Sequence, residues 1–178
     1  MPVLRARRSL VLALCLLVAG PAFAQDSSTV MGSAAVEIAE PSVFQNLGDL
    51  DFADIAVAAL GTATINPNTG ALTTTGGVDR AGGTPTAALF AIWPAKRGAI
   101  FIGIPRSPVI LTRESGTETV SVSNWTLSSV AQPVGSGRYK IVAGDEVIQF
   151  KIGGTLSVPD NPTPGSYVGT FEVTLENL

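Results

Sequence analysis

The chain has 178 residues, with eleven Lys and Arg against fourteen Asp and Glu, no His, and a single Cys. Its formal net charge of −3 gives no bulk electrostatic attraction to nucleic acid or to anionic lipid surfaces, so neither is an expected partner.

The first 24 residues have the pattern of a secretory signal peptide. Three arginines precede an apolar run, 10–18, and the small-residue site Ala22-Phe23-Ala24 follows. The run is far shorter than the roughly 20 residues that cross a membrane. We predict a signal peptide at residues 1–24 that directs export by the general or the twin-arginine route, and a mature chain without a membrane span. That chain is expected in the periplasm, at the cell surface or outside the cell.

Cleavage after Ala24 changes the chemistry of the chain. It removes three of the eleven basic residues and no acidic one, which leaves eight against fourteen and a net charge of −6. It also removes Cys15, so the mature chain has neither His nor Cys and no disulfide stabilises it. The commonest general base, zinc ligand and thiol nucleophile are therefore missing. We expect a protein that is not an enzyme and needs no cofactor.

The start of the mature chain alternates in a strand-like way. We predict a flexible N-terminal extension at residues 25–33 and one β-sandwich domain at residues 34–178. Small and apolar residues occupy the even positions, Val30, Gly32, Ala34, Val36 and Ile38. The part from Ala34 on is interpreted as the first strand of the domain itself, whereas the role of residues 25–33 is left open.

Short β-like runs between turn signals fill the middle of the chain. A turn at Asn66–Gly70 separates Ala63–Ile65 from Ala71–Thr73, and Asp51–Leu60 fits either a helical turn or a strand. Further strands are predicted at Thr86–Trp93, Ala99–Ile104, Val109–Arg113, Glu118–Ser123 and Arg138–Val142. This pattern predicts an all-β fold, an antiparallel two-sheet β-sandwich.

Two groups of residues are candidates for ligand sites. Asp49, Asp51 and Asp54 offer oxygen ligands, but their spacing does not match a calcium loop, so we expect turn and strand-end residues and no metal. Four aromatic residues would stack on a sugar only if they shared an exposed face, and we expect them to fill or cap the core instead. They are Trp93, Trp125, Tyr139 and Tyr167.

A long strand is predicted at Val147–Val158. Gly153-Gly154 resembles a hairpin turn, but a turn there would put Leu156 and Val158 on the opposite face from the apolar residues before it. One strand through the glycines, with a bulge at that point, keeps five apolar side chains on one buried face. These are Ile148, Phe150, Ile152, Leu156 and Val158. The reversal is expected at Pro159–Gly165.

The chain ends in a second alternating segment, expected to run antiparallel to the long strand. Its inward positions are Tyr167, Gly169, Phe171, Val173 and Leu175, and the residues between them are mostly polar. A strand at this place has one edge that the chain itself, or another molecule, must cover.

Several stretches resemble the domain-of-unknown-function 4402 family. They are "LGDLDFADI" (47–55), "GTATINPNTGAL" (61–72), "GGTPTAALFAI" with "IFIGIP" (82–105), and "KIGGTLSVPDNPTPGSYVGTFEVTL" (151–175). The resemblance implies an exported bacterial β-sandwich, immunoglobulin-like or pilin-like, similar to spore-coat-type and chaperone–usher fimbrial subunits. The family tends to have Gly after the Asp-Phe pair, where this chain has Ala53.

The resemblance also implies a role. Fimbrial subunits donate an N-terminal strand to the next subunit, and Val30, Gly32 and Ala34 are the candidate strand-exchange residues. The inward positions of the terminal segment are then the candidate acceptor edge. We expect a structural or adhesive surface protein whose partners are copies of itself or related subunits, a periplasmic chaperone and an outer-membrane usher. The alternative is a self-complete periplasmic or secreted binding module, for instance for glycans, whose N-terminal strand folds back on its own domain.

Overall fold

A computed structural model describes residues 42–94 and 97–177. Its contacts divide the chain between Glu37 and Ile38, and every described residue belongs to the second unit, Ile38–Leu178. No residue in the described ranges is helical, and all paired strands are antiparallel, so the prediction of an all-β protein with two antiparallel sheets is confirmed. The predicted signal peptide and extension lie outside the described residues.

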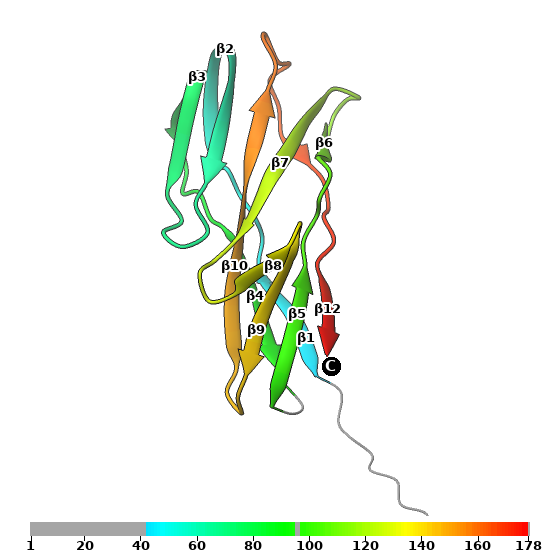
Figure 1. Cartoon of the computed structure of the whole chain (residues 1–178). Helices are drawn as coiled ribbons and strands as arrows, with labels where there is room; N and C mark the ends of the chain where they lie inside the picture. Colours follow the sequence, from blue (N-terminus) through cyan, green and yellow to red (C-terminus); the bar gives the residue numbers. More distant parts are fainter. Residues whose placement is uncertain (1–41, 95–96, 178) are drawn as a thin grey trace, which may run out of the picture. The chain divides into compact units, whose positions relative to one another are not determined.

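The larger sheet has eight strands (Figure 1). Its main path runs β1-β4-β10-β7-β6-β11, and the β2–β3 hairpin joins it through a pairing of β2 with β10. The strands are β1 (Val43–Gly48), β2 (Asp54–Ile65), β3 (Leu72–Gly82), β4 (Ala88–Trp93), β6 (Val109–Arg113), β7 (Thr119–Leu127), β10 (Ile148–Val158) and β11 (Tyr167–Val168).

The smaller sheet has four strands in the order β12-β5-β9-β8. They are β5 (Gly98–Gly103), β8 (Gln132–Gly135), β9 (Arg138–Ala143) and β12 (Thr174–Asn177). The chain therefore crosses between the sheets several times, and two of these crossings, β5 to β6 and β11 to β12, lie side by side because their strands pair with each other.

The segment that fits either a helical turn or a strand is a strand. Asp54–Leu60 forms the first part of β2 and pairs with β3, and the turn predicted at Asn66–Gly70 joins the two strands. Just before β2, Phe52 is buried and Ala53 has a φ of 58°, in the left-handed region that favours glycine. This conformation gives a physical reason for the Gly that the resembling family tends to have there.

The long strand β10 runs through Gly153 and Gly154 as predicted. Its ladder with β7 shifts register between Gly153 and Thr155, which is the expected bulge. Phe150, Ile152, Leu156 and Val158 are buried, whereas Ile148, at the first position, is only half-buried. Val147 lies just outside the strand and is exposed, because its neighbours Asp145 and Glu146 form the bend that leads into β10.

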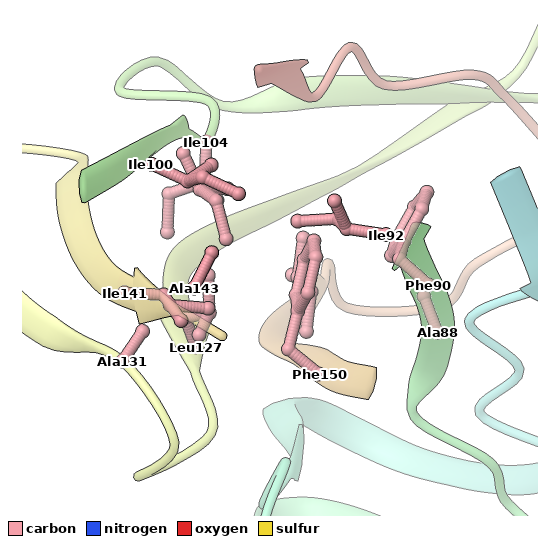
Figure 2. Packing of buried hydrophobic residues seen from close by; sticks show 12 residues of the cluster. Ala88, Phe90, Ile92, Ile100, Ile104, Leu127, Ala131, Ile141, Ala143 and Phe150 are labelled. Atoms are coloured by element: carbon pink, nitrogen blue, oxygen red, sulfur yellow. The ribbon is translucent and has the colours of Figure 1, made fainter. Parts of the chain in front are cut away.

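The core consists of two clusters of buried side chains. The first lies between the two sheets and brings Phe90, Ile92 and Phe150 of the larger sheet against Ile100 and Ile141 of the smaller one (Figure 2). The second cluster is formed mainly by the larger sheet, from β2, β3, β7 and β10. Its members are Phe52, Ala63, Ile65, Val78, Ala87, Val120, Val122, Leu156 and Val158.

The terminal segment differs from the single strand that its alternation predicts. The reversal after β10 occurs as expected, but β11 pairs with β6 and β12 pairs with β5, so β7 and β6 lie between β10 and β11. The two segments differ in length between the β5–β12 pairing and the β6–β11 pairing. Ile104–Leu111 has eight residues, whereas Gly169–Val173 on the other side has five. Pro105 and Pro108 lie in the longer stretch and have no N–H to donate, so no regular ladder forms there.

Candidate functional site

The terminal segment, residues 167–177, carries the candidate acceptor edge. Tyr167 lies opposite Arg113 at the start of β11, and Leu175 lies opposite Ile102 in β12. Gly169, Phe171 and Val173 belong to the stretch between the two strands. The five positions thus follow one another along one segment, but they do not form one strand.

The expected alternation of faces is confirmed. Tyr167, Phe171, Val173 and Leu175 are half-buried, whereas the residues between them are exposed. Phe171, Val173 and Leu175 pack against the first core cluster, and Tyr167 packs against the second. Gly169 is exposed, and a Cβ there would come within 2.6 Å of the carbonyl oxygen of Ile110, so the chain needs glycine to lie this close to β6.

The outer edge of the terminal segment is open. Within residues 42–94 and 97–177, no strand pairs with β11 on the side away from β6, or with β12 on the side away from β5. An edge of this kind presents unpaired backbone N–H and C=O groups to any strand that is laid beside it. Such a strand would also cover the half-buried apolar side chains of the segment.

The opposite edge of the larger sheet, strand β1, approaches the same part of the core. Within the part of the chain that the structure describes, β1 pairs only with β4, and the centre of its Phe44 ring lies 5.6 Å from that of the Phe90 ring. Phe171 approaches the same Phe90 ring at 6.3 Å and the Trp125 ring at 4.7 Å. Among the described residues, the edge strand β1 and the terminal segment therefore both reach Phe90 with a half-buried aromatic side chain.

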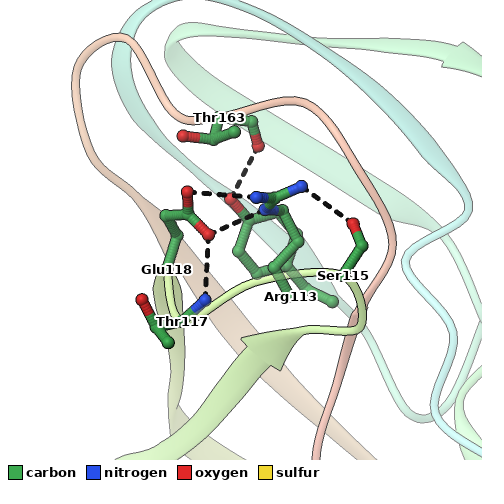
Figure 3. Close-up of polar contacts among 6 residues, drawn as sticks. Arg113, Ser115, Thr117, Glu118 and Thr163 are labelled. Atoms are coloured by element: carbon green, nitrogen blue, oxygen red, sulfur yellow. Dashed lines mark hydrogen bonds and ion pairs between the residues drawn. The ribbon is translucent and has the colours of Figure 1, made fainter.

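A polar corner fixes the first end of the terminal segment (Figure 3). The Tyr167 hydroxyl donates a 2.6 Å hydrogen bond to the carbonyl oxygen of Thr163, four residues earlier. The Arg113 guanidinium donates to Glu118 at 2.8 Å and to Ser115 at 2.8 Å, as Figure 3 shows. The backbone N–H of Glu114 donates a 2.9 Å hydrogen bond to the carbonyl oxygen of Ser166, which joins the β6–β7 turn to the loop before β11.

Charge makes this corner sensitive to acid. Hydrogen bonds from the Arg113 guanidinium, and then from the backbone N–H groups of Glu118 and Thr117, lower the pKa of the Glu118 carboxyl to about 2. The same pairing raises the pKa of Arg113. Glu118 is therefore ionised in the folded protein well below the pH at which a free glutamate takes up a proton.

A second contact fixes the other end of the terminal segment. Arg138 of β9 donates a 2.7 Å hydrogen bond to Glu176 of β12, and its guanidinium lies 4.2 Å from the centre of the Phe101 ring on β5. The three strands are thus linked on their solvent face. Between the two fixed ends, an open hollow of about 470 Å³ separates the Ile104–Val109 connection from Thr170–Glu172.

The other candidate residues have structural roles. Asp51 accepts a hydrogen bond from the backbone N–H of Ala53 at 2.8 Å, and Asp49 accepts one from Asn46 at 2.7 Å, as expected of turn residues beside a buried Phe52. Among the described residues, no group of three or more His, Cys, Asp or Glu side chains is placed to hold a metal ion.

The four aromatic residues do not share an exposed face. Tyr139 and Trp125 pack against the first cluster, and Tyr167 packs against the second together with Trp125. Only Trp93, at the end of β4, is exposed, with 38% of its surface accessible. The arrangement offers no platform of several rings to one sugar.

The candidate strand-exchange residues, Val30, Gly32 and Ala34, lie outside the described residues. The sequence does not indicate that Trp125 lies beside Phe171, that Phe44 and Phe171 approach the same Phe90 ring, or that Arg138 contacts Glu176. No local pattern marks these residues, because each contact joins strands that are far apart in the sequence. Only the alternation of the terminal segment itself was visible.

These features define an all-β protein of two antiparallel sheets with an open edge at its C-terminal segment. The sequence model of the domain of unknown function DUF4402 matches residues 42–176, and the chain belongs to this family. No curated protein matches the chain. Within the described residues, no helix is long and apolar enough to cross a membrane.

Proposed function

We propose that this protein is an exported structural or adhesive surface protein of the fimbrial-subunit type, and that its copies join by strand addition. The open edge of the terminal segment carries the proposal, because its half-buried apolar side chains lie beside unpaired backbone groups. A donated strand gains main-chain hydrogen bonds and covers these side chains at the same time. After position 24 the chain has neither His nor Cys, and this composition is consistent with a role without catalysis.

The finer fold assignment, an immunoglobulin-like or pilin-like sandwich, is part of the same proposal. Its support is the bond from the Tyr167 hydroxyl to the Thr163 carbonyl oxygen, which joins a tyrosine at the start of a strand to the backbone a few residues upstream. Immunoglobulin-like sandwiches use this arrangement at a corner between strands.

The proposed donor is the N-terminal extension, residues 25–33 with Ala34. If this segment adds as a strand, Val30, Gly32 and Ala34 share one of its faces, and a fully buried Val side chain contributes about 1.5–3 kcal/mol. A periplasmic chaperone and an outer-membrane usher are the partners that such an assembly needs. The acceptor is the outer edge of the terminal segment, with Phe171, Val173 and Leu175 as the side chains that the donor covers.

Deletion of residues 25–33 from the exported chain tests this function. We expect the intact protein to sediment as higher-mass species and the deletion variant as a folded monomer with an unchanged circular dichroism spectrum. A variant in which Ser27 and Ser28 are replaced by Ala is the matched control and should assemble normally. Two folded monomers of the same mass would instead support the self-complete binding module and would overturn strand addition.

A further inference from the structure

The solvent face of the larger sheet carries a repeated hydroxyl pattern. Four strands each contain Thr or Ser at two positions separated by one residue, at 62–64, 73–75, 121–123 and 155–157. The middle residue of three of these triplets, Ala63, Val122 or Leu156, is buried in the second core cluster. Because side chains alternate along a strand, the hydroxyl residues lie on the opposite face of the sheet.

The strand register brings these residues into two rows. Thr64 of β2 lies opposite Thr73 of β3 and Thr155 of β10, and Thr155 lies opposite Ser123 of β7. Neighbouring residues of this row are about 4.8 Å apart, the distance between paired strands. The Oγ1 atoms of Thr64 and Thr155 are 3.0 Å apart and share a hydrogen bond.

The second row lies on the same four strands, two residues away from the first row on each of them. Thr62 lies opposite Thr75 and Ser157, and Ser157 lies opposite Ser121. The Oγ1 atoms of Thr62 and Thr75 are 2.7 Å apart. Each hydroxyl has one donor and two acceptor sites, so a pair that shares one hydrogen bond keeps further sites for a ligand. We name the two rows together the hydroxyl face.

Threonine is a favoured residue on exposed strands, and cross-strand Thr pairs stabilise a sheet, so hydroxyls alone do not indicate a ligand. The solvent face of the other sheet supplies the comparison within this protein. It carries the charged residues Arg138 and Lys140 on β9 and Glu176 on β12, the two strands that flank β5. The hydroxyl face has no charged residue in either row.

We propose that the hydroxyl face binds a neutral polysaccharide chain, which lies along the rows and across the strands. The rows carry no charge, and each of their hydroxyl groups can both donate and accept a hydrogen bond. These properties match a neutral polymer rich in hydroxyl groups and not an anionic one. It has no aromatic or Arg side chain in its rows to anchor a protein partner.

The shape of the sheet selects a flexible ligand. Adjacent strands are rotated by roughly 20–25°, so a row of four strands does not lie in one plane. A flexible chain follows such a row, whereas a flat crystalline surface contacts only part of it. The two rows contain only the short side chains of Thr and Ser. Thr73 and Thr75 are exposed, and the other six residues are half-buried.

This proposal concerns a different surface from the open edge, so it does not depend on strand addition. The test is electrophoresis of the full protein through native gels that contain hydroxyethyl cellulose or dextran, both neutral, or alginate, which is anionic. We expect retardation in at least one neutral gel, unchanged by added salt, and none in alginate. Absence of retardation in both neutral gels would overturn the proposal.

The double variant Thr64→Val with Thr155→Val removes two hydroxyls while it keeps β-branched side chains that favour a strand. Loss of one hydrogen bond weakens binding by about 2- to 10-fold, so the double variant should bind at least several-fold more weakly. Thr174→Val, on the solvent face of the smaller sheet, is the matched control and should bind like the unchanged protein. Equal retardation of the double variant and the control would contradict the proposal.

Thr155→Lys gives an independent readout, because it places charge and bulk in the middle of the first row. We expect it to abolish retardation while thermal unfolding shows a folded protein. A lower sedimenting mass for this variant than for the unchanged protein would show that the hydroxyl face joins two copies, which would overturn its assignment to a polysaccharide.

Discussion

At the scale of single residues, one aromatic side chain of the larger sheet, Phe150, is buried in the core cluster between the two sheets. Phe150 is 1% exposed, and its ring lies 5.5 Å from Phe90 and 6.1 Å from Phe44. Because Phe90 also contacts Phe171, the stability of the terminal segment depends on this row of rings. The row sits where the smaller sheet faces the larger one.

We predict that Phe150→Ala lowers the free energy of unfolding by about 3–5 kcal/mol, because a buried ring loses its transfer energy and leaves a cavity. Phe101→Ala is the matched control, since Phe101 is half-buried on the solvent face beneath Arg138. Urea denaturation of both variants measures the difference. Equal losses for the two substitutions would show that Phe150 is not the centre of the core.

At the scale of elements, the sequence predicts strands well where one face is buried. The residues Val109–Arg113 predicted β6 with its observed bounds. The apolar residues on one face of Val147–Val158 predicted that β10 continues through its two glycines. β8 was not predicted, because all four of its residues, Gln132–Gly135, are exposed and give no alternation of burial. β1 was missed in most of its length for a similar reason, since only Phe44 and Gly48 of its residues are half-buried.

The candidate site shows the limit of such arguments. The pattern of Tyr167–Leu175 indicated which side chains face the core, and the structure confirms those faces. It could not show that the segment passes from one sheet to the other, because alternation encodes a face and not a partner strand. The hydroxyl face has the same limit. Its four triplets are visible in the sequence, but only the register of β2, β3, β7 and β10 places them side by side.

The two glycines of β10 give a matched pair of substitutions. A Cβ on Gly153 would lie 2.1 Å from the carbonyl oxygen of Ile65, whereas a Cβ on Gly154 would lie 3.0 Å from a methyl group of Val122. Backbone cannot move aside as a side chain can. We therefore predict that Gly153→Ala lowers the free energy of unfolding by about 3 kcal/mol or more and Gly154→Ala by about 1 kcal/mol. Thermal or urea unfolding measures both, and the reverse order would show the bulge to be placed wrongly.

The corner between β6, β7 and β11 predicts a pH dependence. The pKa of Glu118 falls from 4.5 to about 2 on folding, so its contribution to stability is complete above pH 4.5 and is lost as the pH falls towards 2. Glu118→Gln should remove this part of the acid sensitivity, and Arg113→Gln should remove it as well, because Arg113 is the largest cause of the shift. Urea unfolding at several pH values checks this, and parallel stability curves for the variants and the unchanged protein would refute it.

At the scale of the whole described unit, the two proposed surfaces are compatible. Strand addition uses the outer edge of β11 and β12, whereas the hydroxyl face lies on the solvent side of β3, β2, β10 and β7. A strand laid beside the terminal segment extends a sheet and leaves that face uncovered. An assembly of many copies would then repeat one weak polysaccharide site many times, and repetition raises the total affinity without any new contact.

The last prediction concerns the chemistry of the donor. A peptide that copies Asp26–Ala35 should reduce the assembly of the full protein, because it offers the open edge the same backbone groups and the same apolar Val30 side chain as the proposed donor. In an added strand, Gly32 would share the inward face with Val30, and its lack of a side chain would leave room for the side chains of the acceptor. A peptide that carries the substitution Gly32→Leu should therefore compete about tenfold less well, a difference of roughly 1.4 kcal/mol. Sedimentation of protein refolded with each peptide measures this, with a scrambled peptide as control. Equal inhibition by the unchanged and the substituted peptide would show that the acceptor edge does not contact the side chain at position 32. The donor would then have to lie elsewhere in the chain.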